Sequence, residues 1–106
     1  MVLARALIGL PGEPALLPDY PNPFNATTVI ALLLPEAAHV RVTVYNLLGQ
    51  RVCALVDGQL LAGTHRLSWD GTDGRGQQLT SGAYLRHLGA AGHVAHRRML
   101  LLRQFV

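Results

Sequence analysis

The side chains that could do chemistry in this chain of 106 residues are few, and they include five histidines and a single cysteine. The histidines are His39, His65, His87, His93 and His96. A zinc site needs three or four ligands that converge on one point. His93 and His96 are three residues apart on an expected strand and therefore point to opposite faces. The pattern predicts no metal site, and we expect these histidines to face solvent from strands.

Residues 70–77 read DGTDGRGQ and place Asp70 and Asp73 three residues apart among glycines. Oxygen-rich loops of this kind can bind calcium, but the EF-hand pattern is absent and no further acidic residue follows. Aspartate and glycine are also the residues that a tight turn requires without any ion. The glycines form no phosphate loop, because no helix start with Lys-Ser or Lys-Thr follows. We interpret the stretch as a turn that binds neither cofactor nor metal.

The candidate nucleophiles are Cys53, Ser68 and Ser81. Catalysis by any of them would require a neighbouring histidine and an orienting acid, and the sequence has no GxSxG elbow. A lone cysteine forms no internal disulfide, and in RVCALV it is typical of a small buried hydrophobe. We predict that the protein is not an enzyme.

Composition indicates one folded domain. Half of the residues are hydrophobic and 14% are charged, which is too apolar for a disordered chain. No apolar run approaches the roughly 20 residues of a transmembrane span. All nine basic residues are arginine, and no acidic residue follows Asp73. Nucleic-acid binders usually add aromatic residues or a known motif, which this chain lacks. We predict no nucleic-acid partner and no transmembrane segment.

The first residues, MVLARALIGLPGEP, resemble a signal peptide only weakly. Arg5 supplies one charge, and the apolar stretch 6–10 is shorter than the ~7–15 residues of a hydrophobic signal region. We interpret residues 1–17 as a linker or as the truncated end of an upstream region, and residues 18–106 as one domain. Because so little sequence precedes this domain, we expect a fragment of a longer gene or a detached domain.

Strand patterns recur at short intervals, separated by turn residues and without a helical period. Expected strands span residues 28–34, 40–46, 51–56 and 64–69, with two more within 82–102. DGQLLAG, from residue 57, is expected to turn, and the last two strands should form a hairpin about Gly89 and Gly92. Such spacing predicts an antiparallel β-sandwich or small barrel.

Alternation also predicts the core. The residues expected to be largely buried are Val42, Val44, Leu67, Trp69 and Tyr84. Ile30, Leu32 and Leu34 share one face of their strand, whereas Leu33 lies on the other face. Leu33 is expected either to cover a sheet edge or to contact a neighbouring domain.

Two prolines precede the first long strand. Pro21 and Pro23 fix φ and have no N–H to offer to a β-ladder. We expect them to hold the segment extended and out of sheet pairing until about Thr27, so that it sets the register of the strand. Phe24 should pack back onto the sandwich, and Asn22 or Asn25 should cap the turn.

Four blocks in this order carry a family resemblance: YPNPFNATTVI, VYNLLGQRV, AGTHRLSWDGTDGRGQQLTSGAY and RRMLLLR. Together they resemble the C-terminal sorting domain (type A) of proteins exported by the type IX secretion system, over roughly residues 18–103. The later blocks are also similar to the immunoglobulin-like domain of the flagellar hook-capping protein. The proline segment, residues 20–24, favours the sorting domain.

The resemblance implies an all-β, immunoglobulin-like antiparallel β-sandwich of about seven short strands at the end of a larger secreted protein. Such a module is non-catalytic and directs its cargo through the type IX secretion system to the cell surface of a Gram-negative bacterium, via the periplasm. The implied partners are the translocon and its shuttle, and often a sortase-like peptidase that attaches the cargo to a surface lipopolysaccharide. The alternative is a structural immunoglobulin-like module of an extracellular or flagellar hook-capping-like protein.

The resemblance also implies which residues are recognised. The family motifs fall on Pro21, Asn22, Pro23, Phe24, Gly49, Gly82, Tyr84, Arg98, Met99 and Leu100. In two departures, Ala26 replaces a usual proline, and Arg98 replaces a usual lysine, keeping the charge but not the compact ammonium. The terminal strand RRMLLL is expected at a sheet edge, where a partner could add a strand.

Overall fold

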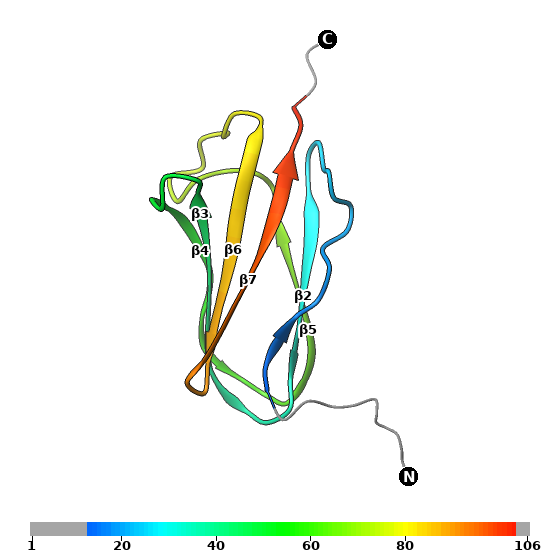
Figure 1. Ribbon diagram of the computed structural model, residues 1–106, viewed down its shortest axis with the longest axis vertical. Helices are drawn as coiled ribbons and strands as arrows, with labels where there is room; N and C mark the ends of the chain where they lie inside the picture. The colour runs from blue at the N-terminus through cyan, green and yellow to red at the C-terminus, as the bar shows by residue number, and fades with distance from the viewer. Residues whose placement is uncertain (1–12, 104–106) are drawn as a thin grey trace.

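The computed structural model describes residues 13–103, and within this range the chain forms two antiparallel sheets and no helix (Figure 1). The strands are β1 (Ala15–Leu16), β2 (Thr28–Leu34), β3 (Ala38–Asn46), β4 (Arg51–Leu60), β5 (Gly63–Trp69), β6 (Gly82–Ala90) and β7 (His93–Leu101). The prediction of an immunoglobulin-like sandwich of about seven strands is confirmed. The interpretation of residues 1–17 as a linker or as the truncated end of an upstream region falls largely on residues 1–12, which lie outside the described residues.

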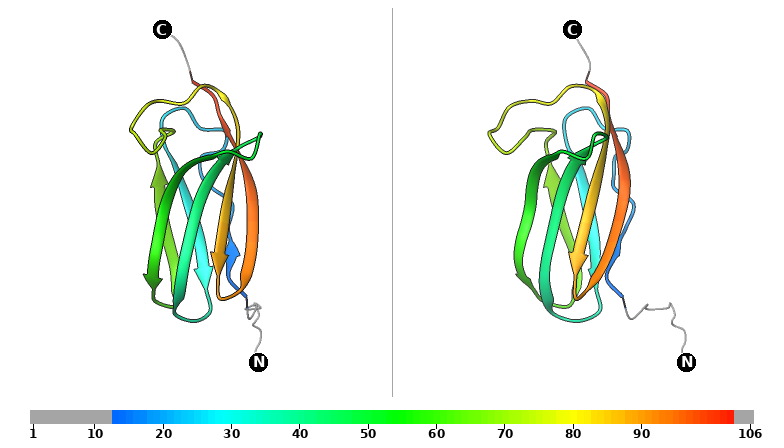
Figure 2. Two further views of the ribbon diagram at one scale, coloured as in Figure 1. Left: turned by 90° about the vertical axis from the view of Figure 1, so that its left-hand side faces the viewer. Right: turned by 60° about the vertical axis from the view of Figure 1, so that its left-hand side comes forward.

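The two sheets have the strand orders β1-β2-β5 and β4-β3-β6-β7. Figure 2 shows them as two facing layers. The order places β3, β6 and β7 together and β2 beside β5, as in immunoglobulin-like sandwiches, with β4 added next to β3.

Apolar residues at every second strand position fill the space between the sheets. On β2 these are Ile30, Leu32 and Leu34, and all three are buried. On β3 the valines 40, 42 and 44 are wholly buried. Trp69 and Tyr84 are also buried, as predicted, whereas Leu67 is only half-buried. Leu33 lies on the outer face of β2, half-buried, and pairs in register with Ala15 and Thr64.

Two expected turns are placed differently. Residues 57–60 do not turn but continue β4, whose pairing with β3 runs to Ala38 opposite Leu60. Across this pair Asp57 Oδ1 lies 2.7 Å from His39 Nε2, and Asp57 Oδ2 lies 3.6 Å from Arg41 Nε. Aspartate usually favours turns, but these contacts with β3 hold Asp57 in a strand. In the last hairpin Gly89 belongs to β6, and the turn is Ala91–Gly92 with φ of 52° and 80°. Two consecutive positive φ values are typical of a type I′ hairpin turn.

The proline segment also differs from its expectation. It bends, both its X–Pro peptide bonds are cis, and it pairs with strands on either side. Tyr20 exchanges backbone hydrogen bonds with Val29, at 3.1 and 2.8 Å, and Phe24 forms a parallel bridge to Leu101. The idea of an extended, unpaired lead-in is therefore wrong, because the residues around the prolines supply the N–H groups that the prolines lack. The expected packing of Phe24 onto the sandwich is confirmed, since its side chain is buried.

Candidate functional site

The motif residues gather at one end of the sandwich, the end where β7 finishes and the chain continues to its C-terminus (Figures 1 and 2). Gly82 opens β6 opposite Leu101, and Tyr84 lies in register with Asn46 at the end of β3. Gly49 occupies the turn between β3 and β4 with a φ of 83°. Such a φ strains any residue with a side chain, so glycine is required for this turn. The topology thus brings parts of all four sequence blocks to one end.

Asn22 and Phe24 bind directly to the last strand. The Leu100 N–H donates to Asn22 Oδ1 at 3.0 Å, and Asn22 Nδ2 lies 3.5 Å from the Arg98 carbonyl. Phe24 N–H donates to the Leu100 carbonyl at 3.0 Å, and Leu102 N–H donates to the Phe24 carbonyl at 2.8 Å. Asn22 therefore caps the edge of β7.

The pairing with Asn22 and Phe24 corrects the expectation of a free edge at the end of β7. The strand does lie at the edge of its sheet, next to β6 alone. Over residues 98–102, however, its outward backbone groups are taken by the proline segment of the same chain. A partner could add a strand here only by displacing that segment.

Phe24 and Tyr84 hold this end together from inside. Their rings pack against Trp69, with centroid separations of 5.5 Å to Phe24 and 5.6 Å to Tyr84. Trp69 Nε1–H donates to the Thr72 carbonyl at 3.0 Å, and the Tyr84 hydroxyl donates to the Thr80 carbonyl at 2.8 Å. The latter bond has the form of the tyrosine corner of immunoglobulin-like domains. These two motif residues therefore contribute to the packing of the core.

The terminal motif divides between core and surface. Met99 is wholly buried, whereas Arg98 and Leu100 face outward. Within residues 13–103 no carboxylate lies within 4.0 Å of the Arg98 guanidinium. Leu100, two residues along the same face of β7, is an exposed apolar neighbour of Arg98. Arg98 is therefore an exposed motif residue without an ion-pair partner in this range.

A buried ion pair, which was not predicted from the sequence, joins Arg86 of β6 to Asp19, just before the proline segment. Arg86 Nη1 lies 2.6 Å from Asp19 Oδ1, and Arg86 Nη2 donates to the Leu17 carbonyl at 2.9 Å. Thr28 Oγ1 lies 2.7 Å from the Pro21 carbonyl and 3.2 Å from Asp19 Oδ2. Burial lowers the pKa of Arg86, and the hydrogen bond and charge of Asp19 oppose that effect. The available signal was the inward position of Arg86, two residues from Tyr84 and Leu88 on an alternating strand.

The loop that begins at Asp70 is a turn, as expected. Asp73 Oδ1 accepts hydrogen bonds from the backbone N–H groups of Gln77 at 3.0 Å and Arg75 at 2.8 Å. These bonds lower the pKa of Asp73. Asp70 Oδ1 accepts from the Thr72 N–H at 3.2 Å. Each carboxylate thus holds its own stretch of backbone.

Cys53 is half-buried beside Trp69. Burial raises the pKa of its thiol, and the nearby charges of Asp70 and Asp73 act in the same direction. A thiol with a raised pKa has little thiolate at neutral pH and is a poor nucleophile. The hollow next to it is lined by residues 53–55, 68–70 and 72–74, none of which is a histidine.

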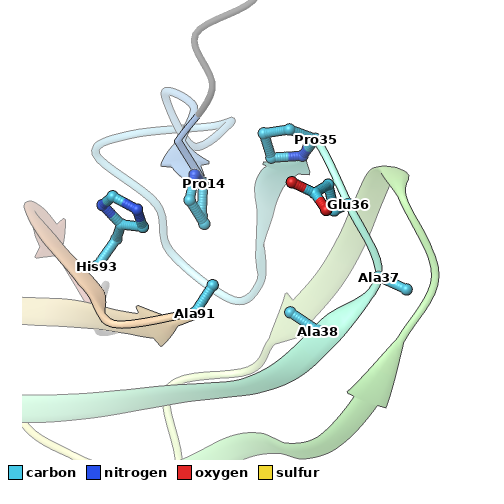
Figure 3. A pocket seen from close by; sticks show the side chains of 7 residues that line it. All are labelled: Pro14, Pro35, Glu36, Ala37, Ala38, Ala91 and His93. Atoms are coloured by element: carbon cyan, nitrogen blue, oxygen red, sulfur yellow. The ribbon is translucent and has the colours of Figure 1, made fainter.

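A small cavity lies at the opposite end of the sandwich. Its volume is about 240 Å³, and its lining is Pro14, Pro35, Glu36, Ala37, Ala38, Ala91 and His93 (Figure 3). Among the described residues that line it, Glu36 and His93 are the ionisable ones, and the others are proline and alanine. The motif residues contribute nothing to this cavity.

Across residues 13–103 no three histidine, cysteine or acidic side chains come close enough to hold a metal ion between them. The same part of the chain has no helix of the length and apolarity that would cross a membrane.

Comparison with protein families matches residues 22–91 to the FlgD Ig-like domain. The chain belongs to this family. The match begins at Asn22 and takes in the ring cluster of Phe24, Trp69 and Tyr84. Comparison with curated proteins gives no match.

Solved structures with the same fold extend the comparison. A dimeric latent PorU from Porphyromonas gingivalis has a TM-score of 0.69 at 18% identity, over 87% of this chain and 10% of that one. PorZ, an essential surface component of the type IX secretion system of that bacterium, has a TM-score of 0.57 at 22% identity, over 80% of this chain and 11% of that one. FlgD from P. aeruginosa has a TM-score of 0.57 at 24% identity, over 88% of this chain and 76% of that one. This FlgD Ig-like domain thus spans about a tenth of PorU and PorZ.

Proposed function

We propose that this domain is a non-catalytic sorting and anchoring module, which directs a secreted cargo protein through the type IX secretion system to the cell surface. Its partners are the translocon and its shuttle, with a sortase-like peptidase where the module is cleaved. It acts on the route from the periplasm to the outside of a Gram-negative bacterium. It binds no nucleic acid.

The observation that carries the proposal is the contact of Asn22 and Phe24 with Arg98 and Leu100. Two blocks of the sorting-domain resemblance, more than 70 residues apart in sequence, are joined by backbone and side-chain hydrogen bonds. Their contact makes one continuous surface at the end of β7, with Arg98 exposed on it. Motifs that are far apart in sequence can be recognised together in a folded domain only if folding places them on one surface, as it does here.

The likeness to PorZ supports the same system, because PorZ is described as a component of type IX secretion. That likeness is one of fold. The residues of the proposed surface are assigned from hydrogen bonds and exposure in this chain, and not from PorZ.

Recognition by this surface uses side chains. The backbone edge of β7 at residues 98–102 is already occupied, so a partner reads the guanidinium of Arg98 and the apolar side chains beside it. The complementary partner surface would carry an acidic group opposite Arg98 and apolar side chains around that group.

The test is export of a cargo fused to the domain, in a host with a working type IX translocon. We expect the Arg98→Ala fusion to fold, by circular dichroism, yet to accumulate in the periplasm. Arg97→Ala is the matched control, because Arg97 is also exposed but alternates to the other side of β7. Surface delivery of the folded Arg98→Ala fusion would remove Arg98 from the recognition surface. Delivery of the parent fusion without the translocon would refute the sorting function itself.

A second candidate is a structural immunoglobulin-like module of an extracellular or flagellar hook-capping-like protein. The observation that favours it is membership of the FlgD Ig-like domain family over residues 22–91. Under this alternative the fusion is not exported by the type IX translocon, and neither arginine variant changes its location.

A further inference from the structure

Two histidines lie side by side on the outer face of the four-stranded sheet. His87 of β6 pairs directly with His96 of β7, and Thr43 of β3 stands on the other side of His87. The two imidazole rings have centroids 5.3 Å apart and an interplanar angle of 43°. The ring of Tyr45 meets His87 edge-on, with centroids 6.0 Å apart, and supports it from the β3 side.

The strand register explains why these rings approach each other. Leu100 and Arg98 direct backbone groups away from β6, toward Asn22 and Phe24. Their pairs with β6 are therefore non-hydrogen-bonded, and so is the pair of His87 and His96, because the register continues without a shift. Opposite side chains are closest at such positions.

The ring nitrogens of this pair have no partner in residues 13–103. The three other histidines there do have one. His39 Nε2 lies 2.7 Å from Asp57, His65 Nε2 lies 2.6 Å from the Leu61 carbonyl, and His93 Nδ1 lies 3.5 Å from Glu13. His87 and His96 are thus the histidines with both ring nitrogens without a partner in this range.

We propose that His87 and His96 form a two-imidazole chelate for a divalent transition-metal ion on the outer face of the sheet. A metal–nitrogen bond of about 2.0–2.1 Å and a tetrahedral angle place two coordinated imidazole centroids about 5 Å apart. The observed separation of 5.3 Å meets this requirement, and rotation about χ2 of the half-buried His87 ring and the exposed His96 ring would aim their nitrogens at the ion.

The surroundings decide which ions bind. The flanking register pairs are Leu85 with Arg98 and Gly89 with Val94, and none of these residues has a carboxylate. Mg²⁺ and Ca²⁺ require oxygen ligands and are therefore excluded. Imidazole suits Cu²⁺, Ni²⁺ and Zn²⁺, and Cu²⁺ binds most tightly in the general order of affinities. The remaining coordination positions stay open to water or to a donor from a partner, whether or not the domain is a sorting module.

Calorimetric titration of the whole chain with Cu²⁺, Ni²⁺, Zn²⁺ and Mg²⁺ tests the proposal. We expect one ion per chain, Cu²⁺ tightest and Mg²⁺ unbound. His87→Gln and His96→Gln should each weaken Cu²⁺ and Zn²⁺ binding at least tenfold. The double variant His39→Gln/His65→Gln loses as many histidines as the double variant of the pair and should bind within twofold of the parent.

Zinc-dependent shifts of the imidazole ring protons in NMR spectra identify the ligands independently. Only the signals of His87 and His96 should move at the first equivalent. Retained affinity in the folded double variant His87→Gln/His96→Gln, equal loss in the control, or shifts at other histidines first would each overturn the proposal.

Discussion

Arg86 and Asp19 form a fully buried ion pair, with 2.6 Å between Nη1 and Oδ1, that links the middle of β6 to the segment preceding Pro21. Both side chains are shielded from water, at 0% and 2% exposure. Arg86 Nε has no hydrogen-bond partner among the described residues, so the guanidinium depends on the aspartate for much of its stabilisation. The pair fixes where the proline segment leaves the sandwich, and hence where Asn22 meets β7.

Asp19→Ala should therefore destabilise the domain strongly. Removing one partner leaves a buried charge uncompensated, which costs about 3–5 kcal/mol in the free energy of unfolding. Urea denaturation measures this loss. The double variant Asp19→Leu/Arg86→Met buries no charge, so it should be markedly more stable than the sum of the single changes predicts. Additive losses would show that the two side chains are not coupled.

The bond between Asn22 and β7 leads to a local prediction. Asn22→Ala removes the acceptor of the Leu100 N–H, and we expect a loss of about 1–2 kcal/mol. Hydrogen exchange at the Leu100 amide should accelerate roughly tenfold, as a change of this size implies. Asn25→Ala is the control, because Asn25 is exposed and has no side-chain hydrogen bond within the described range. Unchanged protection at Leu100 would contradict the assigned role of Asn22.

Trp69 should be the costliest aromatic to truncate. It is buried between Phe24 and Tyr84, and Trp69→Ala should cost about 3–5 kcal/mol. A small domain has only about 5–15 kcal/mol in total, so this variant should melt far below the parent or not fold. Trp69→Phe keeps an aromatic ring but loses the bond to the Thr72 carbonyl, and its thermal midpoint should lie between the two. A Trp69→Ala variant that melts with the parent would show that the ring is not part of the core.

Alternation and turn residues predicted the strands and most of the core, because a two-residue period depends only on which face of each strand is buried. Contacts made far apart in sequence were not predictable in this way. Asn22 and Leu100 are 78 residues apart, and no local pattern shows that one side chain caps the other's strand. Arg86 was unexpected because arginine is seldom fully buried, and Asp19 together with the Leu17 carbonyl makes its inward position tolerable. Asp57 and Gly58 have turn propensity, yet pairing with β3 holds them in a strand.

His87 gives a prediction for acidic pH. Burial and the neighbouring His96 lower the pKa of His87 in the folded protein. Unfolded histidine titrates near about 6.5, so below that pH the unfolded chain takes up a proton that the folded chain resists. The contribution to stability is therefore complete above about pH 6.5 and is lost as pH falls toward the pKa of the folded state. His87→Gln should lose less stability than the parent between pH 7 and pH 5, measured by urea denaturation with a chelator present.

The same pair offers a direct measurement of the cause. In His96→Gln the charge of His96 is absent while the burial of His87 stays nearly the same, so the pKa of His87 should rise part of the way toward its ordinary value. NMR titration of the His87 ring proton follows this shift. If the pKa of His87 is identical in parent and variant, burial alone accounts for the lowering. A pKa of His87 at or above the ordinary value in the parent would contradict the prediction of acid sensitivity, because the folded state would then bind the proton as readily as the unfolded chain.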